Sequence, residues 1–343
     1  MTRFAVLAGA LMMLLCACGP QSSLAQSAPG PAGFKRCVNL ANALNAPEEG
    51  DWGYVIRKQD LQRIARAGFD SVRILIAWQN HAATQAPYAI DPVFFARIDE
   101  VVGQAREFGL GVILDLHDDE ALYQRPRQEW QRTLAIWEQV ASHYADAPPN
   151  LIFELVNEPQ GKLQGALWQS FADAALARIR LSNPERWVIL GGDNWNSIDG
   201  LARFEPPDDD HLMLTFHYYD PYKFTHQGAS WFADAPPAGR PWGSPRERRA
   251  LTLAFDRAAA LARARGLPLW LGEFGATKAT AMMDRTRWTG AVRRAAQSRG
   301  LGWCYFDFAT EFGVYDPERE SWIWPLRRTL LDDPARVLRK APE

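Results

Sequence analysis

Along most of the chain, short runs rich in β-branched and aromatic residues alternate with longer segments whose apolar residues recur every three or four positions. The short runs are typical of strands, and a strand followed by an amphipathic helix is the repeating unit of a parallel sheet. Eight such units favour an α/β fold closed as a (β/α)8 barrel, the TIM-barrel architecture, in one domain over residues 34–343. The expected strands are residues 34–40, 71–76, 111–117, 151–156, 187–191, 211–217, 267–273 and 302–308.

The segments between these strands carry clear helix signals. Apolar residues form one stripe in residues 94–108 and another in residues 130–144. Ser244, Pro245 and Glu247 together make a capping box with proline at the first helical position, so a helix is expected to begin there. An open doubly wound sheet is less consistent with the sequence, because no glycine-rich phosphate-binding pattern follows any expected strand.

The beginning of the chain predicts export. A short basic start precedes the apolar run 4–17, which is too short to span a bilayer comfortably and is typical of a secretory signal. The sequence LCAC ending at Cys18 resembles a bacterial lipobox, whereas cleavage after Ala25 would fit an ordinary signal peptidase. We favour a lipoprotein signal in residues 1–18 with a lipid on Cys18, followed by a flexible tether in residues 19–33. The expected location is the periplasm or outer membrane, or the secreted fraction.

The charge balance of the chain narrows the class of ligand. The chain has 38 basic and 40 acidic side chains, so its near-neutral balance offers no electrostatic footprint for nucleic acid or an anionic membrane.

Beyond the expected signal only Cys37 and Cys304 remain, one in the first expected strand and one in the last. We interpret them as two buried small apolar side chains rather than a disulfide, although the first and last strands of a closed barrel are neighbours and the geometry could permit a bond.

Polar and aromatic side chains gather where the expected strands end. In a (β/α)8 barrel the carboxyl ends of the strands converge on one mouth, and active sites of this fold lie there. Arg73 differs in lying within the second strand, and Trp303 in beginning the eighth. The full set is Asn39, Arg73, His117, Asn157, Glu158, His217, Tyr219, Glu273 and Trp303.

Two carboxylates in this set, Glu158 and Glu273, each terminate an apolar run. Burying a carboxylate there is costly unless donors surround it. Two such groups beside hydrogen-bonding and aromatic residues suit the cleavage of a glycosidic bond, in which one acts as acid and the other as an ionised nucleophile or base. Arg73 and the hydroxyl of Tyr219 would favour the ionised partner. Glu154, inside the same strand run as Glu158, is expected to be a structural group in the barrel interior.

Other chemistries fit less well. His117 is followed directly by Asp118, Asp119 and Glu120, but consecutive residues are not spaced for one face of a metal site and are more typical of a solvated turn. No G-x-S-x-G motif supports a serine nucleophile. We therefore expect neither a metal nor another cofactor.

The chain resembles the cellulase family of glycoside hydrolases, family 5, from residue 34 to about residue 331. The resemblance depends on motifs at the expected strand ends. These are residues 38–44 (VNLANAL), 72–74 (VRI), 113–117 (ILDLH), 152–159 (IFELVNEP), 217–219 (HYY), 271–275 (LGEFG), and Trp303. One departure is Asp118, which stands where many relatives have a second histidine, and this puts a sugar contact at that rim in doubt.

The resemblance implies a retaining endo-β-1,4-glucanase that acts on β-linked polysaccharide through a covalent glycosyl-enzyme intermediate, with Glu158 as proton donor and Glu273 as nucleophile. The supporting roles that it implies are a sugar 2-hydroxyl contact for Asn157, positioning of the donor by His217, support of the nucleophile by Arg73 and Tyr219, and stacking on the sugar by Trp303. The same scaffold also hosts β-mannanases and other β-glucanases.

Further aromatic and amide groups are expected at the same mouth. The segment 217–231 and the loop 192–197, which contains Trp195, resemble the cleft walls of endo-acting cellulases, with ordinary loop packing as the alternative. An interpretation from another class is a surface glycan-binding protein on a barrel that has lost catalysis. The protein is expected to be a monomer.

Overall fold

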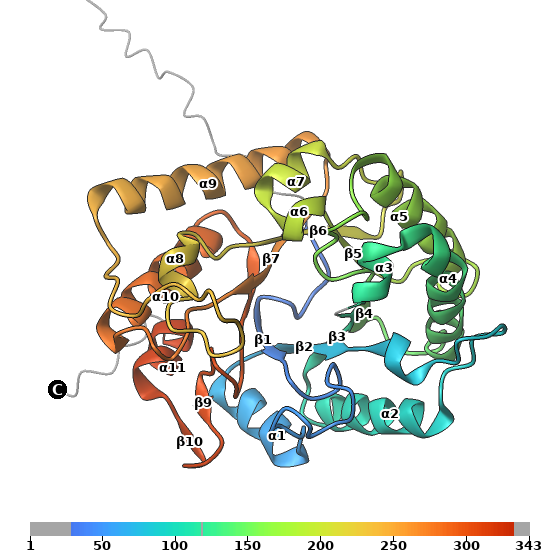
Figure 1. Cartoon of the computed structure of the whole chain (residues 1–343), viewed down its shortest axis with the longest axis horizontal. Helices are drawn as coiled ribbons and strands as arrows, with labels where there is room; N and C mark the ends of the chain where they lie inside the picture. Colours follow the sequence, from blue (N-terminus) through green and yellow to red (C-terminus); the bar gives the residue numbers. More distant parts are fainter. Residues whose placement is uncertain (1–28, 118, 333–343) are drawn as a thin grey trace, which may run out of the picture.

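A closed barrel of eight parallel strands forms the centre of the molecule, in a computed structural model that describes residues 29–117 and 119–332. The strands follow one another around the barrel in chain order, and β1 pairs with both β2 and β8 (Figure 1). All eight expected strands are confirmed. Their bounds are β1 Arg36–Leu40, β2 Ser71–Ile76, β3 Gly111–Leu116, β4 Leu151–Glu154, β5 Val188–Gly191, β6 Leu212–His217, β7 Leu269–Phe274 and β8 Gly302–Tyr305.

The longer helices surround this barrel on the outside, and short helices lie nearer its centre in the view (Figure 1). They are α1 Lys58–Ala67, α2 Pro92–Glu107, α3 Glu120–Gln124, α4 Pro126–His143, α5 Gly165–Arg180, α6 Asp193–Asn196, α7 Ile198–Arg203, α8 Tyr222–Thr225, α9 Pro245–Ala264, α10 Met282–Gln297 and α11 Trp324–Leu331, with a short 3₁₀ helix at Trp78–His81. A small antiparallel pair, β9 Tyr315–Asp316 and β10 Ser321–Trp322, follows the last barrel strand.

The helices begin and bury their faces as the sequence predicts. Ser244 accepts a hydrogen bond from the backbone N–H of Glu247, and the Glu247 side chain accepts one from the backbone of Ser244, so the capping box of α9 is confirmed. The apolar stripes expected in residues 94–108 and 130–144 are the buried faces of α2 and α4. These faces cover the strands and close the outer core.

The core has two layers because successive residues of a strand point to opposite sides. The outer layer lies between strands and helices. The inner layer fills the lower part of the barrel and comprises Phe34, Cys37, Ile113, Ile152, Ile189, Met213, Trp270 and Cys304. Toward the carboxyl ends of the strands the interior becomes polar, and this change places the charged groups at the mouth.

Barrel closure also decides the state of the two cysteines. Cys37 and Cys304 are register partners on β1 and β8, with Cα atoms 4.1 Å apart, and they form a disulfide. The interpretation of two unbonded side chains is therefore wrong. The physical reason is that closure sets the two strands side by side and turns both side chains into the barrel interior.

The expected signal lies outside the described residues, as do Cys18, Ala25 and all of the tether before residue 29. The lipid anchor, the cleavage site and the domain boundary at residue 34 therefore stay predictions. Within residues 29–117 and 119–332, no helix has the length and apolar character that crossing a membrane requires.

Candidate active site

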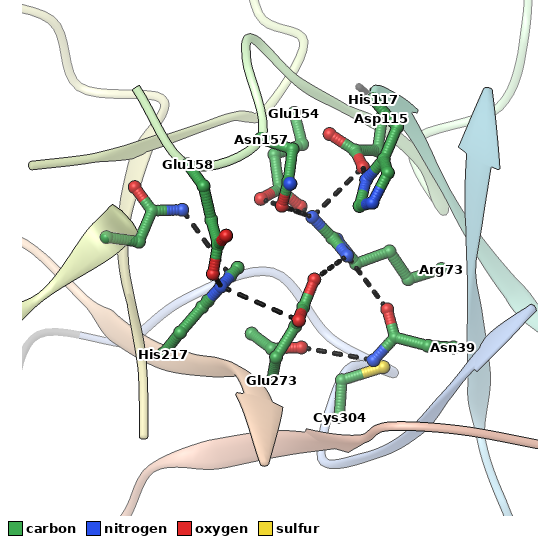
Figure 2. A network of polar contacts seen from close by, with 12 residues as sticks. Asn39, Arg73, Asp115, His117, Glu154, Asn157, Glu158, His217, Glu273 and Cys304 are labelled. Carbon is green, nitrogen blue, oxygen red and sulfur yellow. Dashed lines mark hydrogen bonds and ion pairs between the residues drawn. The ribbon is translucent and has the colours of Figure 1, made fainter. Parts of the chain in front are cut away.

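Arg73 is the centre of the polar network at the mouth (Figure 2). Its guanidinium, fully buried on β2, faces three carboxylates: Nε lies 2.6 Å from Glu154 Oε2, Nη2 lies 3.0 Å from Asp115 Oδ2, and Nη1 lies 2.8 Å from Glu273 Oε1. Burial opposes the charge, but these three acids together raise the pKa of Arg73 well above its ordinary value. The interior role expected for Glu154 is confirmed.

Two asparagines complete the coordination of the guanidinium. Nη1 of Arg73 donates to Asn39 Oδ1 at 2.9 Å, and Nη2 donates to Asn157 Oδ1 at 2.9 Å. Asn39 in turn donates from Nδ2 to the backbone oxygens of Gly272 and Tyr305. This side chain therefore links the Arg73 cluster to β8 and to β7, where Gly272 immediately precedes Glu273.

Glu273 stands near the end of β7 and is almost fully buried. Its Oε1 accepts from Arg73, and its Oε2 accepts from the hydroxyl of Tyr219 at 2.8 Å. Burial and the charges of Glu273 and Glu158 raise the pKa of Tyr219 well above its ordinary value, so this hydroxyl keeps its proton and donates. Two donors, Arg73 on β2 and Tyr219 just after β6, thus hold Glu273 in one orientation.

Glu158 follows β4 and is more open to solvent, with 21% of its side chain exposed against 6% for Glu273. Its backbone has φ of 46°, a conformation that residues other than glycine adopt rarely. His217 Nδ1 lies 2.7 Å from Glu158 Oε1 (Figure 2). Burial lowers the pKa of His217 to about 4, so near neutral pH the ring is uncharged.

The two carboxylates face each other across a short gap (Figure 2). One oxygen of Glu158, one oxygen of Glu273 and one ring nitrogen of His217 all lie within 4.8 Å of one another. This spacing fits the roughly 5–5.5 Å of retaining glycosidases better than the roughly 6.5–9.5 Å of inverting ones. The same trio has the composition of a metal site, and both carboxylates also have protein partners: Glu273 accepts from Arg73 and Tyr219, and Glu158 Oε1 is bonded to His217 Nδ1.

His117 lies across the mouth, and its ring is held by Asp115, an acid that the sequence pattern alone does not indicate. Its Nδ1 is 2.5 Å from Asp115 Oδ2, and both side chains are buried. The available signal was their spacing, because residues two apart on a strand share a face. Asp119 caps α3 by accepting from the backbone N–H of Leu122. Asp118 lies outside the described residues, so its effect on a sugar contact at that rim stays a prediction.

Trp303 does not reach the mouth, and its expected stacking on a sugar is wrong. The side chain is fully buried in the outer core, where it packs edge-on against Phe69 and Phe274. Its neighbour Cys304 takes the inward position on β8, so Trp303 must point toward the helices. Phe306, which directly follows β8, is instead partly exposed, and its ring lies 6.5 Å from that of Tyr219.

Trp195 does lie on the surface, with 51% of its area exposed, and its backbone N–H donates to the carbonyl of Pro159 beside Glu158. On the opposite side, aromatic rings continue outward from Phe306 through Phe312 to the half-exposed Trp231. Both flanks of the carboxylate pair therefore present aromatic faces.

Comparison with known proteins agrees with this arrangement. The sequence matches the family described as Cellulase (glycosyl hydrolase family 5) over residues 36–311. This match extends over most of the chain, so the protein belongs to glycosyl hydrolase family 5.

Three relatives indicate the range of the family near this chain. Endoglucanase H of Acetivibrio thermocellus is 33% identical over 81% of this chain, although the match spans only 30% of that longer protein. Structures of Thermotoga maritima Cel5A with cellobiose and with mannotriose have TM-scores of 0.85, with 38% and 37% identity over 87% of this chain and 97% of theirs. Cellulose synthase subunit Z of Clostridioides difficile has a TM-score of 0.85 and 32% identity over 87% of this chain and all of its own.

Proposed function

We propose that the protein is a retaining endo-β-1,4-glucanase that hydrolyses internal bonds of a β-glucan, with Glu273 as nucleophile and Glu158 as acid/base. The observation that carries the proposal is the pair of carboxylates within 4.8 Å, one enclosed by two donors and the other more exposed and bonded to a neutral histidine. The family membership and the endoglucanase relatives support it.

In the first step Glu273 attacks the anomeric carbon while Glu158 donates its proton to the departing sugar oxygen, so the glycosidic bond breaks and a glycosyl ester forms. In the second step Glu158, now ionised, takes a proton from water as the water displaces Glu273. Arg73 and Tyr219 balance the negative charge of Glu273 before the attack and after its release.

The supporting residues have roles that follow from their contacts. Asn157 presents its oxygen to Arg73, which leaves its Nδ2 group to donate to a sugar hydroxyl beside the reacting carbon. Phe306, rather than Trp303, supplies the apolar face against which that sugar packs. His117, oriented by Asp115, lines the opposite rim.

β-Mannan or glucomannan is the second candidate substrate. One observation favours it: the T. maritima Cel5A fold, similar to this chain along nearly its full length, has been determined with mannotriose as well as with cellobiose. Product sizing on soluble β-glucan, β-mannan and xylan separates the two. Short oligosaccharides released early from carboxymethyl cellulose, with a rapid fall in viscosity, would support internal cleavage of glucan.

The catalytic assignment is tested by azide rescue with an activated aryl β-cellobioside. Azide should restore activity to Glu273→Ala and give a glycosyl azide of inverted configuration, whereas rescue of Glu158→Ala should give the retained configuration. The reverse pattern would contradict the two roles. A wild-type protein that binds carboxymethyl cellulose without cleaving it would instead support the glycan-binding alternative.

We also propose export, with a lipid on Cys18, and a monomeric protein. The Cys37–Cys304 disulfide supports export, because such bonds persist mainly in oxidising compartments. Fatty-acid labelling should mark the wild type and not Cys18→Ala. Cleavage after Ala25 would contradict the anchor by giving an unlabelled protein that begins at Gln26.

A further inference from the structure

The chain leaves β5 through a turn with an uncommon backbone. Asn194, Trp195 and Asn196 have φ of 56°, 58° and 50°, so three successive residues lie in the left-handed region that residues other than glycine rarely enter. The turn sends Trp195 to the surface and buries Asn196 completely. Backbone strain of this kind persists only where the surroundings impose it, and it often marks a functional position.

Two glycines make room for this turn. A Cβ atom on Gly191 would collide with the amide of Asn196, and one on Gly200 would collide with the backbone of Asp193. Both positions therefore require glycine for the buried asparagine to stay where it is. The close fit fixes Asn196 against the ring of His217.

The ring of His217 has a different partner at each nitrogen. Nδ1 lies 2.7 Å from Glu158 Oε1, and Nε2 lies 3.4 Å from Asn196 Nδ2. An amide nitrogen only donates, so Nε2 must accept and carries no proton. The single proton of the neutral ring is then on Nδ1, facing Glu158.

The groups around His217 are charged, yet the ring stays neutral. Burial lowers its pKa to about 4, Glu273 and Asp115 oppose that effect, and Arg73 and His117 add to it. Glu273 Oε2 is 3.7 Å from Nδ1, farther than Glu158. A neutral ring carries one proton, so the hydrogen-bond partners of the ring, and not its charge, decide which nitrogen holds that proton.

We infer that Asn196 is a positioning residue for the acid/base: it fixes the tautomer of His217 so that Nδ1–H always faces Glu158. The inference rests on the proposed function of Glu158. With this tautomer Oε1 accepts a hydrogen bond from Nδ1–H whether or not the carboxyl is protonated, so the catalytic proton sits on Oε2 and passes from that oxygen to the leaving group. With the other tautomer a bare Nδ1 would accept that proton in a hydrogen bond and withhold it from the substrate.

The direct test is Asn196→Asp, which keeps the size and the left-handed preference of the side chain but offers only acceptor oxygens at neutral pH. In ¹⁵N-histidine NMR, the His217 signals are identified by their absence from His217→Gln. The unmodified protein should show Nδ1 protonated and Nε2 bare, and Asn196→Asp should show a proton on Nε2. On soluble β-glucan kcat should fall about 10- to 100-fold, a part of the roughly 10²- to 10⁴-fold that general acid catalysis contributes, with KM little changed.

Asn183→Asp is the matched control, because Asn183 is also a buried asparagine whose Nδ2 donates, but to the backbone oxygen of Ala141 rather than to His217. It should leave both the tautomer and kcat unchanged. Gly191→Ala is a second perturbation that displaces the Asn196 amide without altering its chemistry, and it should loosen the tautomer preference and lower kcat.

Three results would overturn the inference: a proton on Nε2 in the unmodified protein, a bare Nε2 in folded Asn196→Asp, or an unchanged kcat in that variant. The tautomer measurement needs no substrate, so it separates this inference from the proposed function. The expected tautomers in a protein that cleaves no β-glycan would support the role of Asn196 in fixing the ring and overturn the assigned hydrolase activity alone.

Discussion

Arg73 contacts three buried acids at once, and its fork geometry is what allows one cation to do so. A lysine keeps the charge but has one compact ammonium, which cannot contact Glu154, Glu273 and the two asparagines together. We expect Arg73→Lys to lower the free energy of unfolding by about 2 kcal/mol or more, since several hydrogen bonds to charged groups are lost. Urea denaturation measures this loss.

The control for that variant is Arg63→Lys, at a partly exposed ion pair with Asp60. This pair should contribute less than about 1 kcal/mol. Arg73→Lys should also lower kcat/KM on β-glucan, because Glu273 loses its fixed partner. Equal stability losses in the two variants would contradict the central place of Arg73.

Glu154 gives a pH-dependent prediction. Burial, helped by the charges of Asp115 and Glu273, raises the pKa of Glu154 to about 7 although Arg73 opposes the shift. A raised pKa in the folded state means that the stabilising contribution of the protonated form is complete below the unfolded value, near 4.5, and is lost as pH rises through about 7.

Glu154→Gln mimics the protonated form at every pH. Relative to this variant, the wild type should therefore lose thermal stability between pH 4.5 and about 7.5. Melting temperatures of both proteins across that range provide the measurement. A constant difference, or a wild type that gains on the variant as pH rises, would contradict the raised pKa.

At this scale the sequence predicts the position of most site residues, because each follows a strand and the strand ends must converge. It does not predict partners within the interior. Asp115 lies in the middle of an apolar run and looks like an isolated acid until closure of the barrel sets it beside Arg73 and His117. Asn196 was missed for a related reason, since its contact with His217 depends on a left-handed turn.

The strand β8 shows why one aromatic residue was assigned wrongly. The expected strand ran to residue 308, but the observed one ends at Tyr305, and the pleat sends Trp303 outward. Which of two aromatic residues faces the mouth depends on the register and end of a single strand. A run in which nearly every residue is apolar does not determine either of these.

Two variants of β8 and its following residue test the correction. Phe306→Ala should reduce kcat/KM on β-glucan about 5- to 10-fold, the loss of one aromatic contact of about 1 kcal/mol, with little effect on stability. Trp303→Phe should leave KM unchanged but destabilise the fold by about 1–3 kcal/mol, because a void opens between β8 and the helices. The opposite pattern, with KM responding to residue 303, would restore the sequence interpretation.

The centre of the molecule is a closed ring of strands, and its closure depends on the pairing of the first strand with the last. Eight alternating units predict that ring well, since eight strands each followed by a helix are the repeat of a (β/α)8 barrel. The sequence cannot tell whether Cys37 and Cys304 bond, because that depends on both side chains turning inward at the same level. Closure places them as register partners and decides the question.

The disulfide joins residues 267 positions apart, so it restricts the unfolded chain over most of its length. We expect Cys37→Ala/Cys304→Ala to lower the free energy of unfolding by about 2–5 kcal/mol, measured by urea denaturation without reductant. Each single variant already breaks the bond, so the two single losses should sum to clearly more than the double loss. When reductant is added to the unfolded wild type, its free energy of unfolding should fall toward that of the double variant. The double variant should be unaffected by reductant. Additive single losses, or a double variant as stable as the wild type, would show that β1 and β8 are held by strand pairing and packing alone.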